Sequence, residues 1–260
     1  MKKLSLLLML FAGWQLALAQ TEAAKFTSDQ LKDKDFLPSE FSKQFLTTDF
    51  STLWTHTENE YVFGFIGDDY QRIRVKIITV AKIKTLPNTY DVYGKSMVKS
   101  NVDGFHGTMK LTNIRKMGHI STGVDNEYKN KSIKGEYLLL GEYTFAESRA
   151  EKHSGIFKGT FRSDFYVDKH GKVRYDDIEQ VSDSYTNNRF VGSWTPYGAN
   201  TAKGCNWGDY RIPNSGDLDG GAGEFSPTKG LGWETVKNRW SQDKKIQAKA
   251  ITAEKVKWWK

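Results

Sequence analysis

The clearest pattern in the chain is an alternation of apolar and polar side chains over residues 72–84. One face carries mostly apolar or small residues, namely Ile73, Val75, Ile77, Thr79, Ala81 and Ile83. The other face carries mainly Arg and Lys. Successive side chains of a strand point to opposite faces, so this pattern predicts a strand with one buried face.

Shorter stretches of the same alternation recur between residues 59 and 197. The further segments that we expect to be strands are 61–66, 89–98, 105–114, 135–145, 157–167, 172–175 and 189–197. Turn-forming residues separate them at 86–88, 102–104 and 168–171. Amphipathic strands in hairpin order predict an all-β fold, either an antiparallel barrel or a two-sheet sandwich.

Three of these strands contain an aromatic residue followed two positions later by glycine. The pairs are Phe105 and Gly107, Phe157 and Gly159, and Phe190 and Gly192. Both members of a pair lie on the same face of a strand, and a glycine there lets a neighbouring backbone or ring approach closely. We therefore expect these glycines to make room inside the core.

The regions outside the strands differ from one another in amino-acid composition. Residues 20–58 read as a polar N-terminal lead-in, and residues 59–233 as the β-rich domain. That domain ends in a Gly-rich, loop-dominated extension over 198–233. Residues 234–258 lack Gly and Pro, so we expect 234–260 to form a basic C-terminal helix.

The first 19 residues have the three parts of a cleavable secretory signal. Lys2 and Lys3 precede an apolar run of 16 residues, and Ala17 and Ala19 supply the small side chains that signal peptidase requires. The run is shorter than the roughly 20 residues of a membrane-spanning helix. We expect cleavage before Gln20 and an extracytoplasmic location, either periplasmic or secreted.

Charge and cysteine content refine this interpretation. Cys205 is the only cysteine, so an intramolecular disulfide is excluded, and we expect its thiol to be buried.

Removal of Lys2 and Lys3 lowers the formal net charge from +7 to +5. Residues 237–260 hold eight Lys or Arg and only two acids, Asp243 and Glu254. The basic character therefore belongs to the C-terminal segment, which is a weak candidate for contact with a membrane surface. The export signal disfavours nucleic acid as a partner.

No local motif assembles a catalytic centre. The five histidines show no metal-binding spacing, and the chain lacks a Gly-x-Ser-x-Gly elbow. Catalytic residues cannot be named from the sequence, and we expect neither a transition metal nor a cofactor.

The segment 205–224, together with Trp233, concentrates aromatic and acidic side chains. Its candidate ligand-binding residues are Trp207, Asp209, Tyr210, Asp217, Asp219, Glu224 and Trp233. Carboxylates in this segment could bind Ca²⁺, although the spacing is not that of an EF-hand. Aromatic rings could instead stack on a sugar while carboxylates bind its hydroxyls. Turn formation by Asp and Gly explains the same composition without a ligand.

These observations favour an exported, non-catalytic binding or interaction protein for a small molecule or glycan, at a barrel mouth or a loop patch. The alternative is an extracytoplasmic hydrolase that acts on polysaccharide through carboxylates of residues 205–224. An outer-membrane barrel is disfavoured because the chain ends in a Lys-rich segment where a closing strand would be expected.

Overall fold

The computed structural model describes residues 22–221 and 224–260, so the expected signal peptide lies outside the described residues. Ten strands form one antiparallel sheet. They are β1 (Phe36–Glu40), β2 (Val62–Ile66), β3 (Gln71–Lys82), β4 (Thr89–Val98), β5 (Asn101–Met117), β6 (Gly135–Glu147), β7 (Gly155–Val167), β8 (Val173–Tyr175), β9 (Asn187–Pro196) and β10 (Lys203–Asp209).

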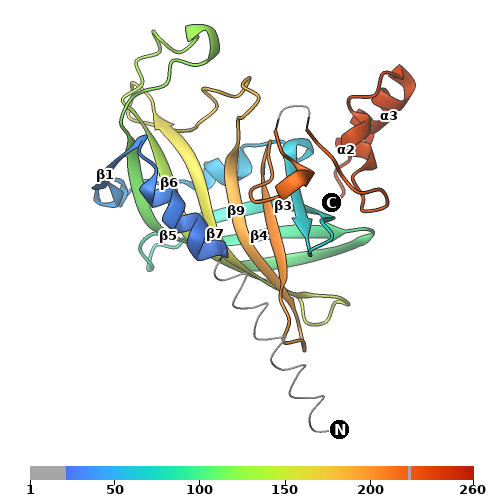
Figure 1. The fold of residues 1–260 in the computed structure, drawn as a ribbon. Helices are drawn as coiled ribbons and strands as arrows, with labels where there is room; N and C mark the ends of the chain where they lie inside the picture. Colours follow the sequence, from blue (N-terminus) through green and yellow to red (C-terminus); the bar gives the residue numbers. More distant parts are fainter. Residues whose placement is uncertain (1–21, 222–223) are drawn as a thin grey trace.

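Eight of these strands close into a barrel (Figure 1). Strands β2, β3, β4, β5, β6 and β7 pair in sequence order. β9 then pairs with β7 and with β10, and the pairing of β10 with β2 closes the barrel. β1 lies against β5, and β8 against β7. The all-β prediction is therefore confirmed, and the architecture is a barrel, not a sandwich.

The remaining elements are short helices. Residues 22–32 are helical, and two helices follow near the C-terminus, α2 (Glu234–Asn238) and α3 (Lys244–Glu254). The 3₁₀ turns are η1 (Ser42–Phe45), η2 (Ser51–Thr55), η3 (Asn59–Tyr61), η4 (Val124–Asn126) and η5 (Gly216–Leu218). The predicted single C-terminal helix is thus split, and α3 restarts at Asp243, whose carboxylate accepts hydrogen bonds from the Lys245 and Ile246 amides.

One turn and one strand differ from the sequence prediction. Residues 102–104 lie inside β5, and the reversal comes at Lys99 and Ser100, where Lys99 has φ of 56°. β10 lies within the range predicted to be loop-dominated. The sequence did not predict this strand because it is short, contains two glycines and has a carboxylate, Asp209, at one of its inward positions.

The alternation in β3 also changes phase. Ile73, Val75 and Ile77 point into the barrel core as predicted, but a β-bulge lies between Ile77 and Thr79. The extra residue shifts every later side chain to the opposite face. Val80 consequently packs against the core, and Thr79 and Ala81 are exposed.

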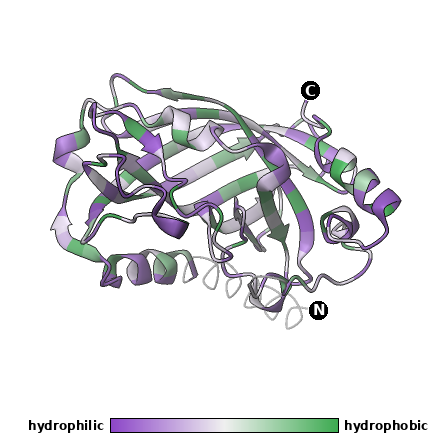
Figure 2. Cartoon of the chain, turned by 90° about the horizontal axis from the view of Figure 1, so that it is seen from above, coloured by the Kyte–Doolittle hydropathy of each residue, from purple (hydrophilic) through white to green (hydrophobic). Residues whose placement is uncertain are grey.

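Side chains fill the middle of the barrel, as expected for eight strands. Green and purple bands alternate along the strands in Figure 2. The fully buried rings include Phe105, Tyr143, Phe145, Phe161 and Phe190. The glycine prediction is confirmed, since a Cβ on Gly192 would lie 2.7 Å from the Tyr143 hydroxyl oxygen and one on Gly159 would lie 2.9 Å from it.

Residues 41–58 close one end of the barrel, which we call the plug end. Trp54 Nε1 donates to Ser163 Oγ at 2.9 Å, and Asn188 Nδ2 donates to the Leu53 carbonyl at 2.9 Å. The Phe50 amide donates to the Tyr90 hydroxyl at 3.1 Å. The opposite end, which we call the hairpin end, carries the connections 67–70, 99–100, 148–154 and 197–202.

The C-terminal segment covers the outer face of β2 and β3. Arg72, expected on a solvent-facing side, is only 6% exposed and its guanidinium lies 5.4 Å from the Trp233 ring. Arg72 Nη2 contacts Glu254 Oε2 at 2.6 Å, and Arg74 Nη2 contacts Glu254 Oε1 at 2.8 Å. One of the two acids of the basic tail is therefore fixed in a buried ion pair with the barrel.

Candidate functional site

A cavity of about 500 Å³ opens at the hairpin end of the barrel, and we call it the mouth cavity. All four hairpins contribute residues to its lining. Its apolar residues are Ile66, Ile73, Val98, Phe157 and Trp194. This volume and this apolar lining are typical of small-molecule sites.

Glu147 is one of two buried carboxylates in the lining. It continues the inward face of β6 beyond Phe145 and is 5% exposed. Its oxygens accept hydrogen bonds from Ser96 Oγ at 2.6 Å, the Gly155 amide at 2.8 Å and Trp194 Nε1 at 2.9 Å. Burial raises the pKa of Glu147 although these three donors act against it. Glu147 thus holds Trp194 and the hairpin in place.

Asp103 is the second buried carboxylate, and it accepts fewer hydrogen bonds than Glu147 does. It lies two residues before Phe105 on the inward face of β5 and is 4% exposed. Asn101 Nδ2 donates to its Oδ2, but within residues 22–221 and 224–260 no donor reaches Oδ1 and no cation forms an ion pair with it. Burial raises the pKa of Asp103. Oδ1 is not among the buried unpaired atoms of the described residues, so it is open to the cavity and can accept a hydrogen bond from a ligand.

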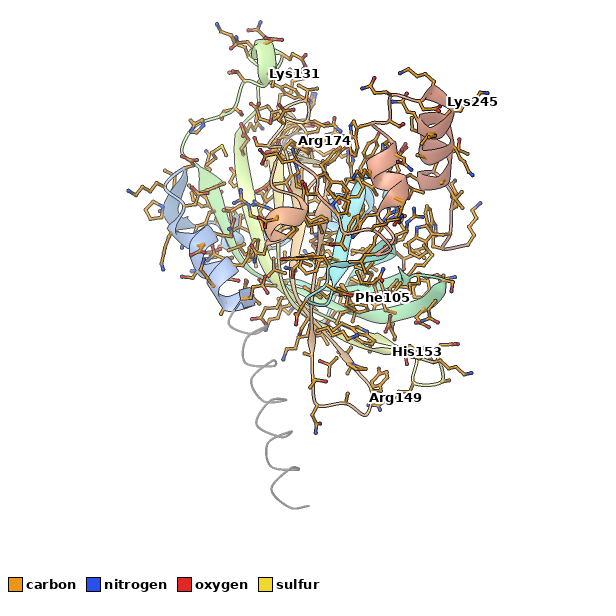
Figure 3. The ribbon with its side chains drawn as sticks, turned by 45° about the vertical axis from the view of Figure 1, so that its right-hand side comes forward. Phe105, Lys131, Arg149, His153, Arg174 and Lys245 are labelled. Atoms are coloured by element: carbon orange, nitrogen blue, oxygen red, sulfur yellow. The ribbon has the colours of Figure 1, made fainter. Side chains whose placement is uncertain are left out.

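Three basic side chains lie at the rim. Lys99, His153 and Lys203 line the cavity and are exposed. Figure 3 shows His153 and Arg149 at the hairpin end, far from Lys131 and Arg174 at the plug end. The exposed acid Asp69 also lines the rim, so the mouth cavity combines an apolar floor, a carboxylate open to a ligand and an entrance of mixed charge.

In the lining of this cavity, Ser96 Oγ is hydrogen-bonded to Glu147, and no histidine that the structure describes is bonded to Ser96. Cys205 is fully buried in the barrel core, and burial raises the pKa of its thiol, so the reactive thiolate is disfavoured. Among the residues that the structure describes, no group of three or more His, Cys, Asp or Glu side chains is arranged to hold a metal ion.

The residues named from the sequence do not converge on one site. Trp207 is in the barrel core, where its ring stacks on Phe190 at 4.7 Å. Trp233 is 1% exposed in a separate apolar cluster outside the barrel, and its Nε1 donates to the Tyr70 carbonyl at 2.8 Å. Asp217 and Glu224 are exposed.

Asp209 lies in a buried polar network at the plug end. Its Oδ2 accepts hydrogen bonds from Thr57 Oγ1 at 2.7 Å, Asn188 Nδ2 at 2.8 Å and the Tyr175 hydroxyl at 2.9 Å. Burial raises the pKa of Asp209 to about 6. These contacts tie residues 41–58 to β8, β9 and β10, so Asp209 stabilises the plug.

Two of the named residues do share a cavity. Tyr210 and Asp219 both line an open groove between the barrel and the C-terminal helices. Asp219 is held there by Arg211 Nη1 at 2.7 Å and by the Ile212 amide at 3.0 Å. Its carboxylate is therefore already occupied.

Sequence reasoning gave a barrel mouth as one possible location but named no residue of the mouth cavity, although a signal for two of its residues exists. Asp103 and Glu147 each extend the inward-facing alternation of a strand next to a turn, in phase with Phe105 and Phe145. A carboxylate on the apolar face of a strand is costly unless it has a partner or a role. A carboxylate at such a position therefore indicates a candidate site.

The described residues contain no helix of sufficient length and hydrophobicity to cross a membrane. No family model matches this chain, and no curated protein or solved structure is similar enough to count as a relative.

Proposed function

We propose that this protein is an exported, non-catalytic binding protein whose mouth cavity holds a small molecule with an apolar body and a protonated amine. Asp103 carries this proposal, because it is a buried carboxylate with a free acceptor oxygen in a cavity of about 500 Å³. An ammonium group would replace water at this oxygen, donate a hydrogen bond to it and balance its charge.

The floor of the cavity supports the apolar part of the ligand. Phe157 and Trp194 offer ring surface, and Ile66, Ile73 and Val98 offer aliphatic surface. Burial of apolar area contributes about 25 cal/mol per Å². The amine fixes orientation, since a charge-assisted hydrogen bond is stronger than a neutral one.

The hydrolase alternative has less support. Retaining and inverting glycosidases need two carboxylates that face each other across a cleft. Asp219 is engaged by Arg211, while Asp217 and Glu224 are exposed. The binding function therefore accounts for more of the observed geometry.

A matched series of ligands tests the amine. We expect n-alkylammonium ions to bind more tightly than n-alkanols of the same length, as measured by calorimetry. Asp103→Asn should weaken ammonium binding by roughly 10-fold or more, because a charged hydrogen bond contributes about 1.5–3 kcal/mol. Since burial raises the pKa of Asp103, ammonium affinity should also fall as the pH is lowered through that pKa and Asp103 takes up a proton.

Asp68→Asn is the control, because Asp68 is an exposed acid beside the same mouth and does not line it. It should bind as the native protein does. Equal affinity for ammonium ions and alkanols, or an Asp103→Asn variant with native affinity, would contradict the proposed ligand class.

The export part of the proposal has its own measurement. Protein recovered from the extracytoplasmic fraction should begin at Gln20, because Ala17 and Ala19 suit signal peptidase. N-terminal sequencing checks this. Recovery of the uncleaved chain in the membrane fraction would show that the N-terminal segment is an anchor.

A further inference from the structure

A second cavity, larger than the mouth cavity, lies near the plug end, well away from it. This groove has a volume of about 1010 Å³ and runs between the barrel and helices α2 and α3. η3 and β2, the loop before β9, the segment after β10, and the C-terminal helices all contribute to it. Figure 3 shows Lys245, on α3, near the top of the view and His153 near the bottom.

Aromatic side chains dominate the barrel side of the groove. The rings of Tyr61 and Tyr210 are stacked at 5.3 Å with an interplanar angle of 15°. Tyr185 meets Tyr210 edge-on at 5.0 Å. On the helical side, Trp240 lines the groove and is 64% exposed. An indole left so exposed beside a wall of tyrosines is typical of a binding surface.

The backbone at Tyr210 is held in an unfavourable conformation. Tyr210 has φ of 66°, a left-handed value that is rare for a bulky residue. Its amide donates to the Tyr61 carbonyl at 2.7 Å, and Gln180 Nε2 donates to its hydroxyl. Strain of this kind is concentrated at functional sites. In this conformation Tyr210 lines the groove.

Most charged side chains of the groove form ion pairs with one another. Arg211 pairs with Asp219 at 2.7 Å, while Arg239 and Lys255 pair with Glu60 at 3.2 Å and 3.8 Å. The other ionisable side chains in the lining, apart from the tyrosines, are Lys237 and Asp183, which are of opposite sign. A groove with so little net charge gives no advantage to a polyanion or a polycation.

We propose that this groove is a second binding site, which takes a neutral oligosaccharide. The flat carbon-bound faces of sugar rings pack on Trp240 and on the tyrosine wall. Sugar hydroxyls both donate and accept, so they can bond to Gln180, Asp183 and Lys237 along the groove. The groove volume of about 1010 Å³ suits a chain of sugars more than a single one.

Calorimetry with neutral hexasaccharides of glucose, xylose and mannose tests the proposal. The native protein should bind at least one of them. Trp240→Ala should weaken that binding by roughly 10-fold or more, since the ring is an exposed contact surface and its removal leaves the core intact. Tyr210→Gly should also weaken binding while it relieves the positive φ.

Two controls separate this site from other effects. Tyr93→Ala removes a ring that is 38% exposed on the barrel wall, and it should leave sugar affinity unchanged. Asp103→Asn should leave it unchanged as well, because the mouth cavity is at the other end. Absence of binding to all three hexasaccharides, tighter binding of a sulfated polysaccharide, or native affinity in Trp240→Ala would overturn the proposal without affecting that for the mouth cavity.

Discussion

Ile77→Asp is expected to lower the free energy of unfolding by about 3 kcal/mol or more. Ile77 is 8% exposed, belongs to the barrel core and pairs with Gly94 on β4. An aspartate there would bury a carboxylate without a partner and would lose the apolar contacts of the isoleucine. Urea denaturation at neutral pH measures the loss.

Two neighbouring substitutions serve as controls for Ile77→Asp. Lys76 points outward, where its ammonium lies 5.5 Å from the Trp259 ring, so Lys76→Asp should cost far less. Thr79→Asp should also be mild, because the β-bulge places Thr79 in solvent. A severe loss in Thr79→Asp would mean that the strand is not bulged and that the simple alternation of the sequence continues through it.

Glu254→Ala is expected to cost about 3–5 kcal/mol, as is usual when one partner of a buried ion pair is removed. The variant would leave two guanidinium groups without their carboxylate, since the side chains of Arg72 and Arg74 are only 7% and 14% exposed. Thermal and urea denaturation measure the effect. Asp243→Ala, which removes only the N-cap of α3, should cost about 1 kcal/mol.

The same ion pair predicts a pH dependence. Burial alone would raise the pKa of Glu254, but the hydrogen bonds and charges of Arg72 and Arg74 bring it below its ordinary value. A carboxyl whose pKa is lower in the folded state stabilises the fold above its unfolded pKa, and this contribution disappears as the pH falls. The difference in stability between the native protein and Glu254→Ala should therefore narrow as the pH falls below the ordinary pKa of a glutamate and through the lowered pKa of Glu254. A constant difference would show that the lost stability comes from packing.

The strands were predictable from the sequence because their signal is local. The apolar and polar side chains of a half-buried strand alternate with a period of two residues. The signal for β3, β4 and β7 therefore lies within 12, 10 and 13 residues of sequence. The choice between barrel and sandwich was not local. It depends on whether β10 pairs with β2, and short strands with polar inward residues carry little signal for such a long-range pairing.

The binding sites were harder to predict for the same reason. Asp103 and Glu147 become neighbours only when β5 and β6 pair and the barrel closes around them. Segment 205–224 was conspicuous because its aromatic and acidic residues are close in sequence, yet Trp207 and Trp233 end up in different apolar clusters. Tyr210 was the useful part of that prediction, since it lies in the groove.

The pairing of β2 with β10 also has a consequence for how the protein folds. The barrel cannot close until residues 203–209 reach residues 62–66, which lie more than half the chain away. Folding slows as contacts become more distant in sequence, because loop-closure entropy must be overcome before the contacts form. The hairpins from β2 to β7 can form early, whereas closure must wait for the last strand. Until then the edges of β2 and of the growing sheet stay unpaired, so a chain that stops before residue 203 should be prone to aggregate.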